Sequence, residues 1–134
     1  MTRTLLDTSA YSALMRGRPA VRDALREADE VLMSVVVLGE LRAGFRKGSR
    51  LGRNEEILRE FLDEPRVQVV GTDEETSVRY AIIHDYLRRR GTPVSVNDVW
   101  IAAAASQHGA RVLTADGDFR RIAQVVVDYI GPTA

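Results

Sequence analysis

Short apolar runs alternate along the chain with longer segments in which apolar positions recur every three or four residues. Five runs have the length and residue types of buried strands, at Thr4–Leu6, Val31–Met33, Val67–Val70, Arg111–Thr114 and Val125–Tyr129. The sequence contains no hairpin signal between them. Strands that alternate with helices favour a parallel sheet. We therefore expect an α/β three-layer sandwich with a central, mostly parallel sheet of four to five strands.

The helical periodicity predicts a series of helices between these strands. They cover residues 10–16, a segment that begins at Pro19, residues 35–46, residues 55–62, a long segment between Thr72 and Gly91, and residues 98–108, with a short helical turn at 117–119. In the longest helix we expect Val78, Ile82 and Tyr86 on one apolar stripe, with Ile83 and Leu87 beside it.

Polar residues at the starts of these segments predict where the helices begin. The expected N-caps are Thr8 or Ser9, then Ser34, then Thr72 in a capping box with Glu75, and Asn97. Asp118 is expected to cap the short turn near the end of the chain.

Length and composition place limits on the protein class. The chain has 134 residues, which fits a single domain spanning residues 1–134. It has no cysteine, so a metal would be held by oxygen or imidazole ligands. Its longest apolar stretches are far shorter than the roughly 20 residues of a membrane-spanning helix. We expect a soluble, cytoplasmic protein without a membrane partner.

Five of the 19 positive charges are gathered in one stretch, although the formal net charge is zero. Lys47 is the only lysine, and Arg42, Arg46, Arg50 and Arg53 surround it near Gly48 and Gly52. Such a cluster is either a solvated connection or a contact for a polyanion, and the sequence supports both interpretations.

Four acidic residues lie at comparable places in the predicted fold. Asp7 follows the first strand, Glu40 lies about two turns into a helix, Asp98 starts a helix and Asp116 follows the fourth strand. Asp7, Asp98 and Asp116 each have an ordinary explanation as a turn or first-turn residue. In a parallel sheet, however, the carboxyl ends of the strands and the starts of the following helices share one edge, which brings these three together. Glu40 has only apolar or small neighbours on its helix, so we expect it to point into a cleft and to reach the same edge if that helix leans over the sheet.

Carboxylates that meet repel one another unless a cation compensates their charge or one of them keeps a proton. Oxygen ligands alone select Mg²⁺ or Mn²⁺, which also bind phosphates. Thr8, Ser9, Asn97 and Thr114 are expected to orient these carboxylates or the substrate phosphate. His84, His108 and Trp100 are expected to have structural roles, because no second histidine stands at metal-binding spacing and the few aromatic residues do not alternate with cations.

Four motifs together resemble the PIN-domain ribonucleases, in particular the VapC-type toxins of toxin–antitoxin pairs. They are Leu6-Asp7-Thr8-Ser9, Gly39-Glu40-Leu41, Asn97-Asp98-Val99-Trp100-Ile101-Ala102-Ala103 and Leu113-Thr114-Ala115-Asp116-Gly117-Asp118-Phe119. The match is nearly end to end, and the order and spacing of the motifs make it specific.

The resemblance implies an endoribonuclease that depends on Mg²⁺ or Mn²⁺. Its metal ligands would be Asp7, Asp98 and Asp116, with Glu40 in the same catalytic cluster and Asp118 as an alternative to Asp116. It also implies an RNA substrate, a cognate antitoxin whose carboxyl-terminal segment occupies the cleft, and a homodimer or a toxin–antitoxin hetero-oligomer.

Three other hypotheses compete with this one. A receiver domain would need a lysine after its last strand, but the only lysine is Lys47. A haloacid-dehalogenase-like phosphatase would need a second aspartate where Ser9 stands. The remaining alternative is a PIN-like domain that binds RNA or protein without cleaving, and the four filled acidic positions argue against it.

Overall fold

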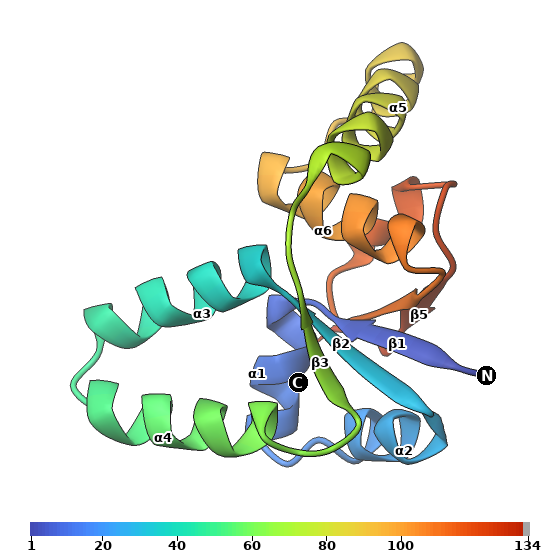
Figure 1. Ribbon diagram of the computed structural model, residues 1–134. Helices are drawn as coiled ribbons and strands as arrows, with labels where there is room; N and C mark the ends of the chain where they lie inside the picture. The colour runs from blue at the N-terminus through green and yellow to red at the C-terminus, as the bar shows by residue number, and fades with distance from the viewer. Residues whose placement is uncertain (133–134) are drawn as a thin grey trace.

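The computed structural model describes residues 1–132, in which five parallel strands form one sheet (Figure 1). The strands are β1 (Arg3–Leu6), β2 (Glu30–Ser34), β3 (Val67–Val70), β4 (Arg111–Thr114) and β5 (Val127–Tyr129). Their order across the sheet is β3-β2-β1-β4-β5. The predicted parallel α/β architecture is confirmed, with the last strand two residues shorter at its start than expected.

Helices cover both faces of this sheet, so the chain forms three layers. The helices are α1 (Thr8–Met15), α2 (Pro19–Glu27), α3 (Val35–Lys47), α4 (Leu51–Leu62), α5 (Glu74–Arg90) and α6 (Val96–Gln107), followed by the 3₁₀ turn η1 (Gly117–Arg121). Figure 1 shows α5 and α6 on one side of the sheet and α1 and α2 on the other. None of the helices within residues 1–132 has the length and apolar character needed to cross a bilayer.

The core is densest around the two central strands. Leu5 and Leu6 of β1 and Val112 and Leu113 of β4 have no exposed surface. Helix α6 contributes the run Ala102–Ala105, whose side chains are all buried. Because alanine is small, α6 can pack closely on the sheet, which brings the amino end of α6 over the carboxyl edge of β1 and β4.

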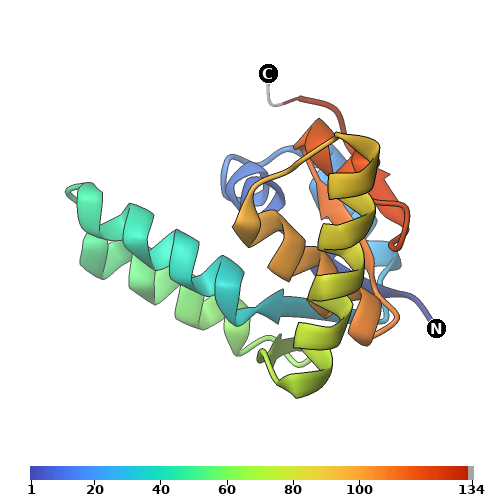
Figure 2. The same cartoon turned by 90° about the horizontal axis from the view of Figure 1, so that it is seen from above.

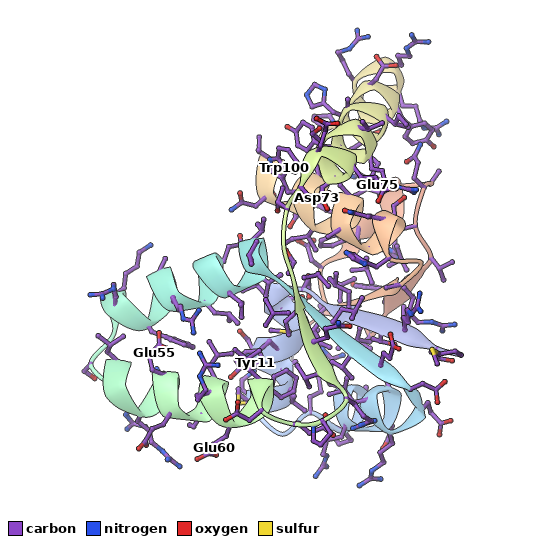
Figure 3. All side chains as sticks on the ribbon, viewed as in Figure 1. Tyr11, Glu55, Glu60, Asp73, Glu75 and Trp100 are labelled. Atoms are coloured by element: carbon purple, nitrogen blue, oxygen red, sulfur yellow. The ribbon has the colours of Figure 1, made fainter. Side chains whose placement is uncertain are left out.

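Helices α3 and α4 form an arm that extends away from the sheet (Figures 1 and 2). Figure 3 shows Glu55 between the two helices, where its carboxylate accepts a hydrogen bond from Arg42 Nε at 3.2 Å. Helix α4 begins at Leu51, four residues before the predicted start at Glu55. The extra turn includes the half-buried Leu51 and runs through Gly52, a residue of low helix propensity, so the propensity of Gly52 does not prevent the helix.

Most of the apolar stripe predicted for α5 is exposed, and only Tyr86 of it packs on the core. Val78 and Ile82 are each 56% exposed, whereas Ile83 and Leu87 are buried against the rest of the molecule. Apolar residues lie on more than one face of α5, and its packing on α6 decides which face is covered. The capping box is also shifted by one residue, because Asp73 and Thr76 form it in place of Thr72 and Glu75.

Candidate active site

The candidate site lies where the connections from two neighbouring strands diverge. Strand β1 is followed by β2 on one side of it, while β4 pairs with β1 on the other side, with Leu6 opposite Leu113. Asp7 N–H continues this ladder by donating to the Leu113 carbonyl at 3.2 Å. Crevices at such switch points are where open α/β sheets bind ligands. Asp7 and Thr114 stand at this point.

Asp7 is buried, and its carboxylate is held by three donors. Thr114 Oγ1 donates to Oδ2 at 2.6 Å, while Ser9 Oγ and the Ala10 N–H donate to Oδ1, both at 2.8 Å. Asp7 is therefore the N-cap of α1, which corrects the predicted cap at Thr8 or Ser9. Burial raises the pKa of Asp7, the three hydrogen bonds oppose that shift, and the charge of Asp116 adds to it.

Glu40 is fixed by side chains from two other helices. Thr8 Oγ1 of α1 donates to Oε1 at 2.6 Å, and Asn97 Nδ2 of α6 donates to Oε2 at 3.1 Å. The carboxylate thus ties α1, α3 and α6 together. Thr8 and Asn97, two of the residues expected to orient carboxylates or the substrate phosphate, are the ones that hold Glu40.

Asp98 lies in the first turn of α6, where the negative charges of the other three carboxylates act on it. Its pKa is raised to about 6, chiefly because burial disfavours the charged form, and Asp116, Asp7 and Glu40 add repulsion. The hydrogen bond with Ser95 opposes the shift. The charges of the other three predicted acidic residues therefore all reach Asp98.

Ser95 is a positioning residue that the sequence analysis missed. Its hydroxyl accepts a hydrogen bond from the Asp98 N–H at 3.2 Å, which makes Ser95 the N-cap of α6 in place of the predicted Asn97. The signal was present, because Ser95-Val96-Asn97-Asp98 has the serine-to-acid spacing of a capping box. The shift frees Asn97 to reach Glu40.

Asp116 and Asp118 have different surroundings. The Asp116 N–H donates to Thr114 Oγ1 at 2.8 Å, and Asp116 Oδ1 accepts from the Asp118 N–H at 2.9 Å. Asp116 thereby caps η1, the role predicted for Asp118. The Asp118 carboxylate lies 3.6 Å from Arg121 Nη1. The charge of Asp116 contributes to the raised pKa of both Asp7 and Asp98.

The oxygen donors at this site match the preferences of a hard cation, but the carboxylates are not gathered around one common point. Every ionisable side chain in the cluster offers carboxylate oxygens, which suit Mg²⁺ or Mn²⁺. Within residues 1–132, no group of three or more histidine, aspartate or glutamate side chains is arranged so that it could hold a metal ion. The donor chemistry therefore fits such an ion, while the carboxylates stand apart.

The remaining candidates have structural environments. Trp100 stacks on Tyr80, with ring centroids 4.1 Å apart. His84 also stacks on Tyr80, with ring centroids 5.8 Å apart. Trp100 therefore belongs to the contact between α6 and α5 (Figure 3).

Comparison with known proteins identifies the family. A model described as the PIN domain matches residues 4–125 of the chain. The chain belongs to the PIN domain family.

Relatives of this PIN domain cover nearly its whole length. Ribonuclease VapC4 of Mycobacterium tuberculosis is 36% identical over 126 residues, which are 93% of this chain and 95% of the relative. The structure of DNA-bound VapBC from Salmonella typhimurium has 26% identity and a TM-score of 0.83, covering 96% and 98% of the two chains. FitAcB from Neisseria gonorrhoeae has 30% identity and a TM-score of 0.73, covering 92% and 95%.

Proposed function

We propose that this PIN domain is an endoribonuclease and the toxin of a type II toxin–antitoxin pair. The observation that carries the proposal is the linkage of carboxylates from separate elements at one switch point, with Asp7 held by Ser9 and Thr114 and Glu40 held by Thr8 and Asn97. The names of its relatives support the reaction class, because those 36% and 30% identical are ribonucleases VapC4 and VapC5 of Mycobacterium tuberculosis.

The chain's own residues supply an acidic receptor for a divalent ion. Asp7, Asp98 and Asp116 would hold Mg²⁺ or Mn²⁺, with Glu40 in the same cluster. Such an ion, when bound, polarises a phosphodiester and lowers the pKa of water. The hydrogen bonds from Ser9, Thr8, Asn97 and Thr114 keep the carboxylates in place before substrate arrives, and this preorganisation lowers the cost of reaching the reactive arrangement.

The second component of the proposal is an antitoxin protein. Structures similar to this chain are toxin–antitoxin complexes, including VapBC-1 from Haemophilus influenzae and VapBC-5 from Mycobacterium tuberculosis. A cationic side chain of such a partner would compensate the same repulsion that a metal ion relieves. We propose a cytoplasmic hetero-oligomer built on a homodimer, in which the antitoxin covers the carboxylate site.

A cleavage assay with Mn²⁺ tests the reaction. Asp7→Asn, Glu40→Gln and Asp98→Asn keep side-chain size while removing the charge, so each is expected to lower the rate at least about 100-fold. Asp118→Asn is the matched control, because it removes the same charge from a nearby carboxylate that lies 3.6 Å from Arg121 Nη1. Full activity in the first three variants would remove the proposed mechanism.

A non-catalytic PIN domain that binds RNA or a protein is the second candidate. The observation in its favour is that no three acidic or histidine side chains within residues 1–132 are close enough together to hold a metal ion. The two candidates differ in the same assay, because the non-catalytic domain leaves RNA intact at every concentration of Mn²⁺ and Mg²⁺.

A further inference from the structure

The tip of the α3–α4 arm concentrates positive charge. Residues 41–54 contain five cations and no acidic residue, in a chain whose formal charges cancel. Two of the five are paired, Arg42 with Glu55 and Arg53 with Glu56. Within residues 1–132, no carboxylate forms an ion pair with the other three, Arg46, Lys47 and Arg50, which we call the cationic tip. All three are exposed and lie at the end of α3 or just before α4, and Figures 1 and 2 show the junction of these two helices at the far end of the arm.

The stability of the helices explains only part of this cluster. Arg46 and Lys47 lie in the last turn of α3, where the helix dipole favours cations. Arg50 stands at the N-cap of α4, where the dipole disfavours a cation and a serine or aspartate would be the better residue. Its side chain makes no capping hydrogen bond. The unsatisfied N–H groups of α4 therefore add to the positive potential of the cationic tip, and this potential suits an external anion.

The cationic tip is continuous with the candidate active site along α3. Lys47 comes seven residues after Glu40, which puts it about 10 Å further along the axis and close to the same face. Gly39, Ala43 and Gly44 are exposed on that part of α3. A Cβ added at Gly39 or Gly44 would have no atom within 4 Å, so internal packing does not require either glycine. The helix surface between Glu40 and Lys47 is open to another molecule.

An RNA strand needs such a contact, because the carboxylate cluster repels phosphate. We infer that the cationic tip binds phosphates of the RNA strand to one side of the cleaved bond. The open face of α3 holds the part of the strand that lies between the carboxylates and the cationic tip. This inference rests on the proposed function. An acidic protein segment would also bind the three cations, but only a strand that reaches the carboxylates uses the open face of α3 as well.

Salt dependence of RNA binding tests the inference. The triple variant Arg46→Gln/Lys47→Gln/Arg50→Gln is compared with Arg22→Gln/Arg26→Gln/Arg111→Gln, which removes the same charge from exposed positions on α2 and at the amino edge of the sheet. The probe is a labelled 20-nucleotide RNA of mixed sequence in EDTA. Each single-strand phosphate contact adds roughly 0.7 to the slope of log K against log salt. The tip variant is expected to lose about 2 from this slope, and the control almost nothing.

Length dependence of cleavage gives a second readout. With Mn²⁺, the wild-type chain is expected to cleave the 20-nucleotide RNA faster than a dinucleotide, because only the longer RNA spans the ~10 Å from Glu40 to Lys47. The tip variant loses this advantage and keeps its rate on the dinucleotide. Gly44→Gln, which places a side chain on the open face, also slows cleavage of the longer RNA.

The outcomes separate this inference from the proposed function. A tip variant with the slope and length advantage of the control overturns the inference, even where the wild-type chain cleaves RNA. Competition by poly-glutamate as strong as that by RNA of equal charge also overturns it, in favour of an acidic protein partner. If the wild-type chain never cleaves RNA but the tip variant still loses about 2 from the salt slope of binding, the phosphate contacts of the cationic tip are supported and the proposed nuclease activity is refuted.

Discussion

At the scale of single residues, the site is a set of carboxylates whose charge is costly in the isolated chain. The pKa of Asp98 is about 6, above the ordinary value of 3.8, so the folded chain binds a proton at this residue that the unfolded chain has already lost between these two pH values. Stability is therefore expected to fall as pH rises through this interval. The cause is the burial of Asp98 beside three other acidic side chains.

Asp98→Asn removes this pH dependence. We expect the free energy of unfolding of the variant to exceed that of the wild type increasingly between pH 4 and 6, reaching about 1 to 2 kcal/mol after allowance for the solvent exposure of the side chain. Urea unfolding of both chains at pH 4, 5, 6 and 7 measures the difference. A constant difference across that range would show that Asp98 carries its charge at no cost.

Thr114 is expected to stabilise the charged form of Asp7. Its buried hydroxyl donates to Asp7 Oδ2 and accepts from the Asp116 N–H. Thr114→Val keeps the shape and removes both bonds, so we predict a loss of about 1 to 3 kcal/mol at pH 7. The loss is smaller at pH 4, because the pKa of Asp7 is raised and its protonated form needs the donor less.

Thr92→Val is the matched control for Thr114→Val. The Thr92 hydroxyl is buried and has no hydrogen-bond partner among residues 1–132, so its removal is expected to leave stability unchanged or to raise it. Unfolding at the two pH values is compared for both variants. Equal effects of the two substitutions would mean that the Thr114 bonds contribute nothing.

At the scale of elements, helix starts decide which side chains face the site. Ser95→Ala removes the cap of α6 and is expected to lower the free energy of unfolding by about 1 kcal/mol. Asn97→Ala leaves the cap intact but removes a donor to Glu40, so it is expected to affect RNA cleavage more than stability. Parallel measurement of unfolding and cleavage compares the two variants. The reverse pattern would place the cap at Asn97.

The sequence predicted the types of most elements but not which of several neighbouring polar residues caps them. Asp7, Thr8 and Ser9 are all good N-caps, and the same ambiguity holds for Thr72 with Asp73 and for Ser95 with Asn97. Successive side chains on a helix point about 100° apart, so neighbouring candidates for the cap face different parts of the molecule. Tertiary packing makes this choice, as it does for the covered face of α5.

The candidate site was more predictable than the helix ends. Asp7, Asp98 and Asp116 follow from one rule, which is that parallel strands share a carboxyl edge. Glu40 followed from its apolar neighbours on α3. The sequence could not show that β1 and β4 are adjacent, because strand order depends on contacts distant along the chain. That adjacency places Thr114 against Asp7.

At the scale of the whole molecule, α3 joins the acidic cluster to the cationic tip, because it carries Glu40 near its middle and Arg46 and Lys47 in its last turn. The formal charge is zero because the 19 basic and 19 acidic side chains of the whole chain cancel in number, while the charges of the cluster and of the tip stay separate in position. A polyanion is attracted at one place and repelled at the other, so ionic strength weakens its binding and a cation at the carboxylates strengthens it.

Relief of the carboxylate repulsion predicts a global effect of divalent cations. An ion that binds only the folded chain stabilises it by about 1.4 kcal/mol at ten times its dissociation constant. For a domain of this size, that raises the melting temperature by roughly 5 °C. We expect this rise with Mn²⁺ and Mg²⁺, and its reversal by EDTA, in thermal unfolding of the wild-type chain.

In Asp7→Asn/Asp98→Asn, the charges that bind the ion are gone, so the melting temperature should not respond. Because Asp118→Asn changes the same charge outside the cluster, it should respond like the wild type. An equal rise in all three chains would place the ion elsewhere on the surface and leave the repulsion at this edge to be relieved by a protein partner alone.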